Sequence, residues 1–225
     1  MKHIKLFENY FEDEEWNRLL PYFTMSQSER DRIFFEEIDK YRPNLQVIED
    51  LLDTQLVDPN VRDEWQKTPL HYAVENKKVG LIKYLLDKGA KIDARNKWQQ
   101  TPLHYAVDNN SISVAKLLLD RGADYDARNE WQQTPLHLAA RSDIRQAITK
   151  LLLDRGADYE ARDESQLTPL HLAAINNSRS IAELLLDRGA EIETRDEIQQ
   201  TPLHWAARRG RRAVAELLRS RGATE

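Results

Sequence analysis

Residues 101–106 are Thr-Pro-Leu-His-Tyr-Ala, and this hexapeptide decides the fold because close copies of it recur along the chain. The copies start at Thr68, Thr101, Thr134, Thr168 and Thr201, so the steps are 33, 33, 34 and 33 residues. Each copy is followed by an apolar segment that ends in Gly-Ala. A fixed period of this length is typical of a solenoid, in which each unit packs against its neighbours.

The residues of each copy predict a pair of helices. Thr101 and its equivalents suit a helix N-cap, where a hydroxyl accepts a hydrogen bond from an unpaired main-chain N–H. Pro102 then occupies the first helical position, where its missing N–H does no harm. A second helix is predicted from the apolar stripe through Val114 and Leu118. Gly122 follows this stripe and is expected to end the helix.

The turn between the two helices also has a sequence signature. Asn110 and Gly210 stand where the first helix must stop, and both residue types tolerate a left-handed backbone. Lys77 occupies the equivalent position in the first full repeat. Ser111 and Ser178 come next and are predicted N-caps of the second helix.

This pattern resembles the ankyrin family, whose repeat is a β-turn finger followed by two antiparallel helices. The resemblance covers residues 63–225 strongly and extends weakly back to about residue 28. It implies an all-α solenoid of stacked antiparallel helix pairs with β-turn fingers. It also implies that the hexapeptide histidine is structural, with hydrogen bonds inside and between repeats.

Two features depart from the family pattern. The ankyrin fingertip usually carries glycine, whereas glutamine stands there in every full repeat of this chain: Gln66, Gln99, Gln132, Gln166 and Gln199. Because glutamine avoids positive φ, we expect the finger turn to differ in detail. The third full repeat has one extra residue between Ala140 and Leu151, which we expect to be a neutral loop insertion.

We divide the chain into an N-terminal helical extension (1–27), a degenerate N-terminal capping repeat (28–62) and five ankyrin repeats (63–225). The last repeat is predicted to act as the C-terminal cap, because Arg219 replaces a leucine that the other repeats share at this position. This replacement suggests that the array ends where the sequence ends. Within the capping repeat, residues 45–53 align with the second helix of the first full repeat.

The N-terminal end combines a capping signature with an unassigned helix. Ser26 and Glu29 have the spacing of a capping box, which predicts a helix start. Upstream, aromatic residues at helical spacing predict a helix that Pro21 ends. We expect this helix to pack on the exposed end of the stack, and the alternative is a separate docking segment. The aromatic residues are Phe7, Tyr10 and Phe11.

Composition points to a soluble protein. Apolar residues make up 40% and charged residues 32% of the 225 positions, and cysteine is absent. No run approaches the roughly 18 apolar residues of a membrane-spanning helix. Glu8 and Glu12 interrupt the apolar run that a secretory signal would need. We therefore expect a soluble, cytoplasmic protein.

The net charge of −5 is unevenly distributed. Residues 1–60 hold 14 acidic and 7 basic side chains, and the last 25 residues hold six arginines against two glutamates. The chain thus has an acidic head and a basic tail. This asymmetry bears on solubility and association, and one hypothesis is a structural role through head-to-tail self-association.

Catalytic and metal-binding patterns are absent from the sequence. Five of the six histidines belong to the hexapeptides, one per repeat. Packed helices lie about 8–10 Å apart, so neighbouring histidines cannot share an ion at bond lengths of about 2 Å. The chain contains no phosphate-binding loop, dinucleotide fingerprint or nucleophile elbow. We therefore expect no enzyme activity, no catalytic residue, no cofactor and no metal site.

The resemblance implies binding of another protein through a concave surface formed by the fingers and first helices. On this surface, the residues that the fold does not require are the candidates for the binding site. Their types support this choice, because Trp, Tyr and Arg are enriched at binding hot spots. An acidic or amphipathic protein segment would suit them, and no small-molecule substrate or membrane is expected. The candidates are Trp65, Trp98, Trp131, Arg62, Arg95, Arg128, Tyr72, Tyr105 and Trp205.

Two other interpretations of these columns stay open. Each tryptophan can pack against the next finger, and each arginine can pair with the acidic residues that follow it, which would make the columns structural. The arginine and tryptophan columns could also bind nucleic acid, since both side chains stack on bases. The net negative charge speaks against nucleic acid.

Overall fold

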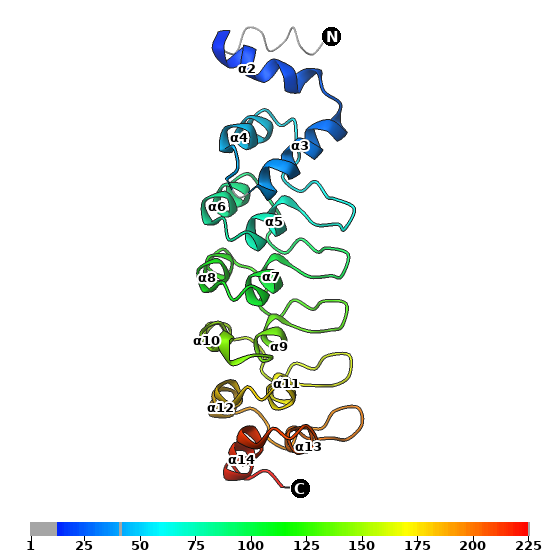
Figure 1. Ribbon diagram of the computed structural model, residues 1–225, viewed down its shortest axis with the longest axis vertical. Helices are drawn as coiled ribbons and strands as arrows, with labels where there is room; N and C mark the ends of the chain where they lie inside the picture. Colours follow the sequence, from blue (N-terminus) through cyan, green and yellow to red (C-terminus); the bar gives the residue numbers. More distant parts are fainter. Residues whose placement is uncertain (1–12, 41, 225) are drawn as a thin grey trace. The chain divides into compact units, whose positions relative to one another are not determined.

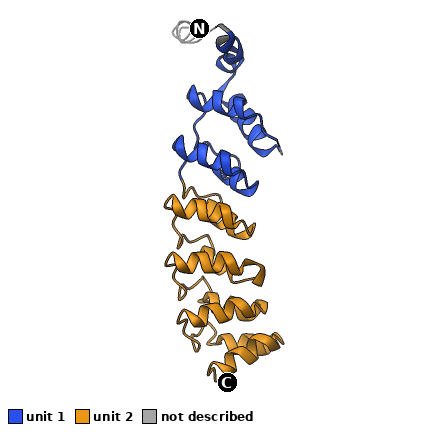
Figure 2. Ribbon diagram, turned by 90° about the vertical axis from the view of Figure 1, so that its left-hand side faces the viewer, with its two compact units in different colours: residues 1–91 blue, residues 92–225 orange. Residues whose placement is uncertain are grey.

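The computed structural model describes residues 13–40 and 42–224, which form two compact units, residues 1–91 and 92–225 (Figure 2). Its secondary structure is helical, and no strand occurs within those described ranges. The predicted all-α class is confirmed. Each unit is a succession of helix pairs and is described separately.

Unit 1 contains a helix followed by two helix pairs. The capping box predicted at Ser26 and Glu29 is confirmed, and it begins the first pair. The second pair is the first full repeat. The helices are α2 (Asp13–Thr24), α3 (Gln27–Asp39), α4 (Leu45–Asp53), α5 (Pro69–Glu75) and α6 (Val79–Asp87).

The prediction that Pro21 ends α2 is wrong. The helix continues through Pro21 to Thr24. Proline lacks an N–H and so donates no hydrogen bond within the helix. The end of α2 is instead bonded by Arg30, whose Nη1 donates to the carbonyls of Tyr22 (3.1 Å) and Met25 (3.0 Å). A side chain of the next helix, α3, thus overrides the local signal.

Helix α2 docks on α4 within unit 1. Arg18 forms a two-pronged ion pair with Asp50 (2.9 and 3.0 Å), and the Asp50 side chain is buried. Leu19 is also buried. The division into 1–27 and 28–62 stays a prediction. The three aromatic residues singled out for the N-terminal helix lie outside the described residues: Phe7, Tyr10 and Phe11.

Unit 2 contains four full repeats. In Figure 1 their first helices follow one another in one row, their second helices in another, and the fingers project on the side of the first helices. The helices are α7 (Pro102–Asp108), α8 (Ile112–Asp120), α9 (Pro135–Ala139), η1 (Asp143–Arg145), α10 (Gln146–Asp154), α11 (Pro169–Asn176), α12 (Arg179–Asp187), α13 (Pro202–Arg208) and α14 (Arg212–Ser220).

The hexapeptide histidine joins consecutive repeats. Nδ1 of His104 accepts a hydrogen bond from the main-chain N–H of Thr101 (3.2 Å), so the ring proton sits on Nε2. Nε2 donates to the carbonyl of Gln133 in the next repeat (3.1 Å). His137 and His171 donate in the same way, also at 3.1 Å. The structural role that the resemblance implied is therefore present in these three repeats.

The turn between helices matches the prediction in its backbone but not in its caps. Asn110 and Gly210 have φ of 47° and 65°, and Lys77 has 55°, so all three are left-handed. Ser111 and Ser178 occupy the predicted N-cap positions, but neither side chain makes a capping hydrogen bond. The predicted positions are right and the predicted capping chemistry is wrong.

The expectation of an altered finger turn is also wrong, because all five fingertip glutamines adopt the left-handed conformation, with φ between 58° and 62°. Side-chain bonds hold this turn. Oδ1 of Asn129 accepts the N–H groups of Trp131 (3.0 Å) and Gln133 (2.9 Å). Arg128 donates to the Gln132 carbonyl (3.2 Å). The cost of positive φ, about 1–2 kcal/mol per residue, is offset by these bonds.

We expect Gln132→Gly to raise the free energy of unfolding by about 1 kcal/mol, because glycine adopts positive φ without steric cost. Gln133→Gly is the matched control: its φ is not positive, so it should lower stability. Chemical denaturation of both variants would measure the difference. Equal effects of the two substitutions would contradict a strained fingertip.

Candidate protein-binding surface

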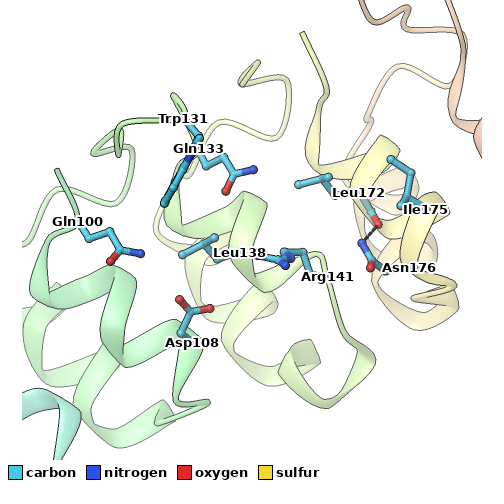
Figure 3. Close-up of a pocket in the computed structure, with 9 residues that line it drawn as sticks. All are labelled: Gln100, Asp108, Trp131, Gln133, Leu138, Arg141, Leu172, Ile175 and Asn176. Carbon is cyan, nitrogen blue, oxygen red and sulfur yellow. Dashed lines mark hydrogen bonds between the residues drawn. The ribbon is translucent and has the colours of Figure 1, made fainter. Parts of the chain in front are cut away.

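Unit 2 has a pocket of about 590 Å³ between the fingers and first helices of three consecutive repeats (Figure 3). Leu138, Leu172 and Ile175 provide its apolar surface, and Trp131 comes from the finger above them. Trp131 is 44% exposed, so its ring is accessible from the pocket. The polar lining residues are Gln100, Asp108, Gln133, Arg141 and Asn176.

The extra residue of the third full repeat lies beside this pocket. Helix α9 has only 5 residues, whereas α7 has 7 and α11 has 8. The chain then turns through η1 before α10 begins. The first helix of this repeat is therefore shortened where it borders the pocket, next to Arg141.

The segment that contains the insertion bonds to both neighbouring repeats, and the neutral character expected of the insertion stays a prediction. Arg145 donates to the carbonyls of Leu138 (2.8 Å) and Asp108 (3.0 Å), at the ends of α9 and α7. Asp143 accepts the N–H of Ile181 in α12 (3.2 Å). The insertion therefore stiffens one wall of the pocket.

The rim of the pocket carries a positive charge without a partner. Arg141 is exposed, and its guanidinium has no hydrogen bond or ion pair with the residues that the structure describes. Asp108 is different, because its carboxylate lies 3.3 Å from Arg145. Burial raises the pKa of Asp108, while Arg145 and Arg141 oppose this rise. Asp108 is thus paired with Arg145, and Arg141 acts on it only through a Coulombic attraction without an ion pair.

Positive charge also gathers at the far end of the first-helix row. The guanidiniums of Arg208 and Arg209 lie 5.5 and 5.7 Å from the ring centre of Trp205. Both arginines are exposed. Cation–π contacts of this kind orient the side chains while leaving their charges available.

The predicted tryptophans differ in their environment. Trp65, in unit 1, and Trp131, in unit 2, are each 44% exposed, whereas Trp98 is half-buried. In unit 2 the main-chain carbonyls of Trp98 and Trp131 each accept an N–H from the next finger at 3.0 Å. Of the three, Trp131 lines the pocket.

The arginine column connects successive fingers. Arg95 donates to the carbonyl of Arg128 (2.6 Å), Arg128 to that of Arg162 (2.6 Å) and Arg162 to that of Arg195 (2.7 Å). In unit 1, Arg62 donates to the carbonyl of Gln66 in its own finger (3.1 Å). Main-chain carbonyls, rather than the following acidic side chains, are the partners in these bonds. The structural interpretation of the column is thus supported in these bonds, but with main-chain carbonyls in place of the expected acidic side chains.

The aromatic column of the first helices also supports the fingers. The Tyr72 hydroxyl donates to Asp63 (2.7 Å), and Nε1 of Trp205 donates to Asp196 (2.7 Å). Tyr105 accepts from the Asn96 amide (2.9 Å). All three aromatics are half-buried. A binding role for them stays a prediction.

Sequence reasoning missed Arg141, Leu138, Leu172 and Ile175. The sequence does carry a signal for Arg141 and Ile175. Each is the seventh residue after a hexapeptide threonine, a position at which charge and size change from repeat to repeat. The column of these positions reads Glu75, Asp108, Arg141, Ile175 and Arg208. Because the fold tolerates any of these residue types there, the column is free to serve binding.

Comparison with known proteins agrees with the repeat geometry. A local match of 48 residues, 38% identical, occurs with alpha-latrocrustotoxin-Lt1a from Latrodectus tredecimguttatus, and it spans 21% of this chain but 3% of the toxin. No helix among the described residues is long and apolar enough to cross a membrane. Nor do residues 13–40 and 42–224 contain a cluster of three His, Asp or Glu side chains suited to a metal ion. The family model for ankyrin repeats matches residues 40–129, 125–196 and 164–224. The chain therefore belongs to the ankyrin-repeat family.

Proposed function

We propose that this chain binds a segment of another protein in the pocket of unit 2, as a non-catalytic adaptor or effector-type module. Ankyrin repeats generally mediate protein–protein interaction. The observation that carries the proposal is the combination of an apolar surface, an exposed Trp131 and an unpartnered Arg141 in one pocket of about 590 Å³. Aromatic and arginine side chains are the residue types that dominate binding energies.

The chemistry of the pocket favours an acidic, amphipathic segment. An apolar side chain of the partner would contact the exposed Trp131 ring and the half-buried Ile175, next to the buried Leu138 and Leu172. A carboxylate next to it in the partner would pair with Arg141. Such a charge pair improves specificity and association rate more than affinity, while the apolar contact supplies most of the binding free energy.

Nucleic-acid binding has less support. It would draw on the arginine column, but Arg95, Arg128 and Arg162 already donate to carbonyls of neighbouring fingers. The net charge of −5 adds general repulsion of a polyanion.

Selection from a random-peptide library on the immobilised chain would test the proposal. We expect enriched peptides that place Asp or Glu beside a bulky apolar residue. Arg141→Glu should weaken binding of a selected peptide about tenfold or more, because a charge pair becomes a repulsion. Trp131→Ala should weaken it as well. Fluorescence anisotropy with the labelled peptide would measure both effects.

Arg179→Glu is the matched control, because Arg179 is exposed on α12 and is absent from the pocket. It changes the net charge equally and should leave peptide affinity unchanged. Thermal melting of the three variants would confirm that each is folded. Peptides without acidic residues, or equal losses in Arg141→Glu and Arg179→Glu, would contradict the proposal.

A further inference from the structure

The face of α13 and α14 that points away from α11 and α12 is exposed in the described part of the chain. In the three preceding repeats, Nε2 of the hexapeptide histidine donates to a carbonyl of the next repeat. His204 binds Thr201 through Nδ1 (2.7 Å to the hydroxyl), but its Nε2 has no hydrogen-bond partner within the described part of the chain. A donor that is satisfied three times in unit 2 is therefore free at its C-terminal end.

The apolar surface of this face is exposed as well. Ala207 is exposed, whereas Val107, Ala140 and Ala174, its equivalents in the preceding repeats, are fully buried. Two hollows of about 280 and 350 Å³ open beside it, one reaching Gly210 and the other reaching His204. The face retains the small residues against which another helix pair could pack.

Positive charge surrounds this face. Residues 202–220, which form α13 and α14, contain five arginines and one acidic residue. Arg212 is exposed and has no ion pair with described residues. A polar cap that served solubility alone would need no single sign of charge, since mixed charges meet that need. The uniform sign points to an acidic occupant.

The chain itself supplies two consecutive acidic helices. Residues 13–39, which form α2 and α3, hold eight acidic and three basic side chains. Glu14, Glu29 and Glu36 are exposed there. The net charge of this segment, −5, opposes the +4 of residues 202–220.

We propose that the C-terminal end face of one copy, α13 and α14, binds the acidic helices α2 and α3 of a second copy. The two surfaces differ, so the contact is heterologous: the basic end of one copy meets the acidic helices of another. Long-range attraction between the opposite charges brings the ends together, and it weakens as salt shortens the screening length. This contact does not use the pocket proposed for the partner protein.

Sedimentation velocity of the full chain tests the proposal. At an ionic strength of about 0.02 M the mean mass should rise with protein concentration, and at about 0.5 M salt it should return to the 26.3 kDa of the monomer. A monomer at every concentration in low salt would overturn the proposal. So would association that salt strengthens, because apolar contacts rather than charges would then drive it.

Charge reversal at each end identifies the surfaces. Arg212→Glu at the C-terminal end and the double variant Glu14→Arg/Glu36→Arg at the N-terminal end should each weaken self-association at least tenfold. Mixing the two variants should restore assembly, because the intact acidic end of the first meets the intact basic end of the second. Arg179→Glu again serves as the control of equal charge change and should assemble like the parent chain.

Each result decides the proposal. Failure of the mixture to assemble would overturn it, and so would an Arg179→Glu variant that dissociates as Arg212→Glu does. Arg212, Glu14 and Glu36 are exposed, and circular dichroism would verify that the variants keep the parent melting behaviour.

Discussion

Replacing His137 with alanine is expected to lower the free energy of unfolding by about 3–4 kcal/mol, because the substitution removes three hydrogen bonds and leaves a cavity. The His137 side chain is fully buried. Its loss would leave the N–H of Thr134 and the carbonyl of Leu167 without their present partner. Leu167 belongs to the following finger, so the substitution weakens the contact between two repeats as well as one helix cap.

His204→Ala is the matched control. The same Thr201 contacts are lost, but no carbonyl of a further repeat is involved and the ring is only half-buried. We expect a loss of about 1 kcal/mol. Urea denaturation followed by circular dichroism would measure both values. Because repeat stability depends on nearest-neighbour contacts, His137→Ala should also broaden the transition. Equal losses in the two variants would contradict the bridging role.

The sequence predicts those parts of the fold that depend on local backbone demands. The threonine and proline of each hexapeptide fix a helix start, and Asn110 and Gly122 have φ of 47° and 88° where helices were predicted to end. These signals need no knowledge of distant residues, because each residue type acts on its own φ or on the nearest N–H groups.

Two of the failed predictions concern backbone positions that nearby side chains hold in place. Pro21 lies inside a helix because Arg30 holds the following turn. Gln132 adopts positive φ because Asn129 and Arg128 bond the finger around it. Neither partner could be assigned from the local pattern, and propensity is a weak guide where such bonds compete with it.

The candidate site was only partly predictable for a similar reason. The residue types of Trp131 marked it as a binding candidate, but Arg128, equally suited by type, donates to Arg162 thirty-four residues away. The pocket itself depends on the shortened α9 beside Arg141. A single inserted residue showed where the repeat deviates, but not that the deviation borders a cavity.

The second large effect is a loss of stability in mild acid. Burial lowers the pKa of His104 to about 4 and also lowers the pKa values of His137 and His171. The unfolded chain, in which histidine titrates near 6.5, binds these protons more readily than the folded chain does. Stability is therefore complete above about pH 6.5 and declines as the pH falls toward 4. For His104 alone the decline amounts to about 3 kcal/mol.

Three partly desolvated carboxyl groups act in the opposite direction over a lower pH range. Burial raises the pKa values of Asp93, Asp108 and Asp126, so the folded chain binds their protons more readily than the unfolded chain does. Protonation of these groups therefore raises the free energy of unfolding as the pH falls through their titration range. That range lies above the ordinary carboxyl pKa of about 4. The change in unfolding free energy between about pH 6.5 and 5.5 therefore comes mainly from the histidines.

Urea denaturation at intervals between about pH 7.5 and 5 would measure this dependence as a slope of unfolding free energy against pH. The parent chain should lose stability throughout the lower half of this range. His104→Asn should show a smaller slope despite a lower stability at neutral pH, because one proton fewer distinguishes the unfolded from the folded state. An unchanged slope in His104→Asn, or a parent chain whose stability is constant across the range, would show that the inner histidines titrate normally. The pH slope thus counts the protons that the unfolded chain binds in excess of the folded chain, and its change in His104→Asn isolates the share of one buried imidazole.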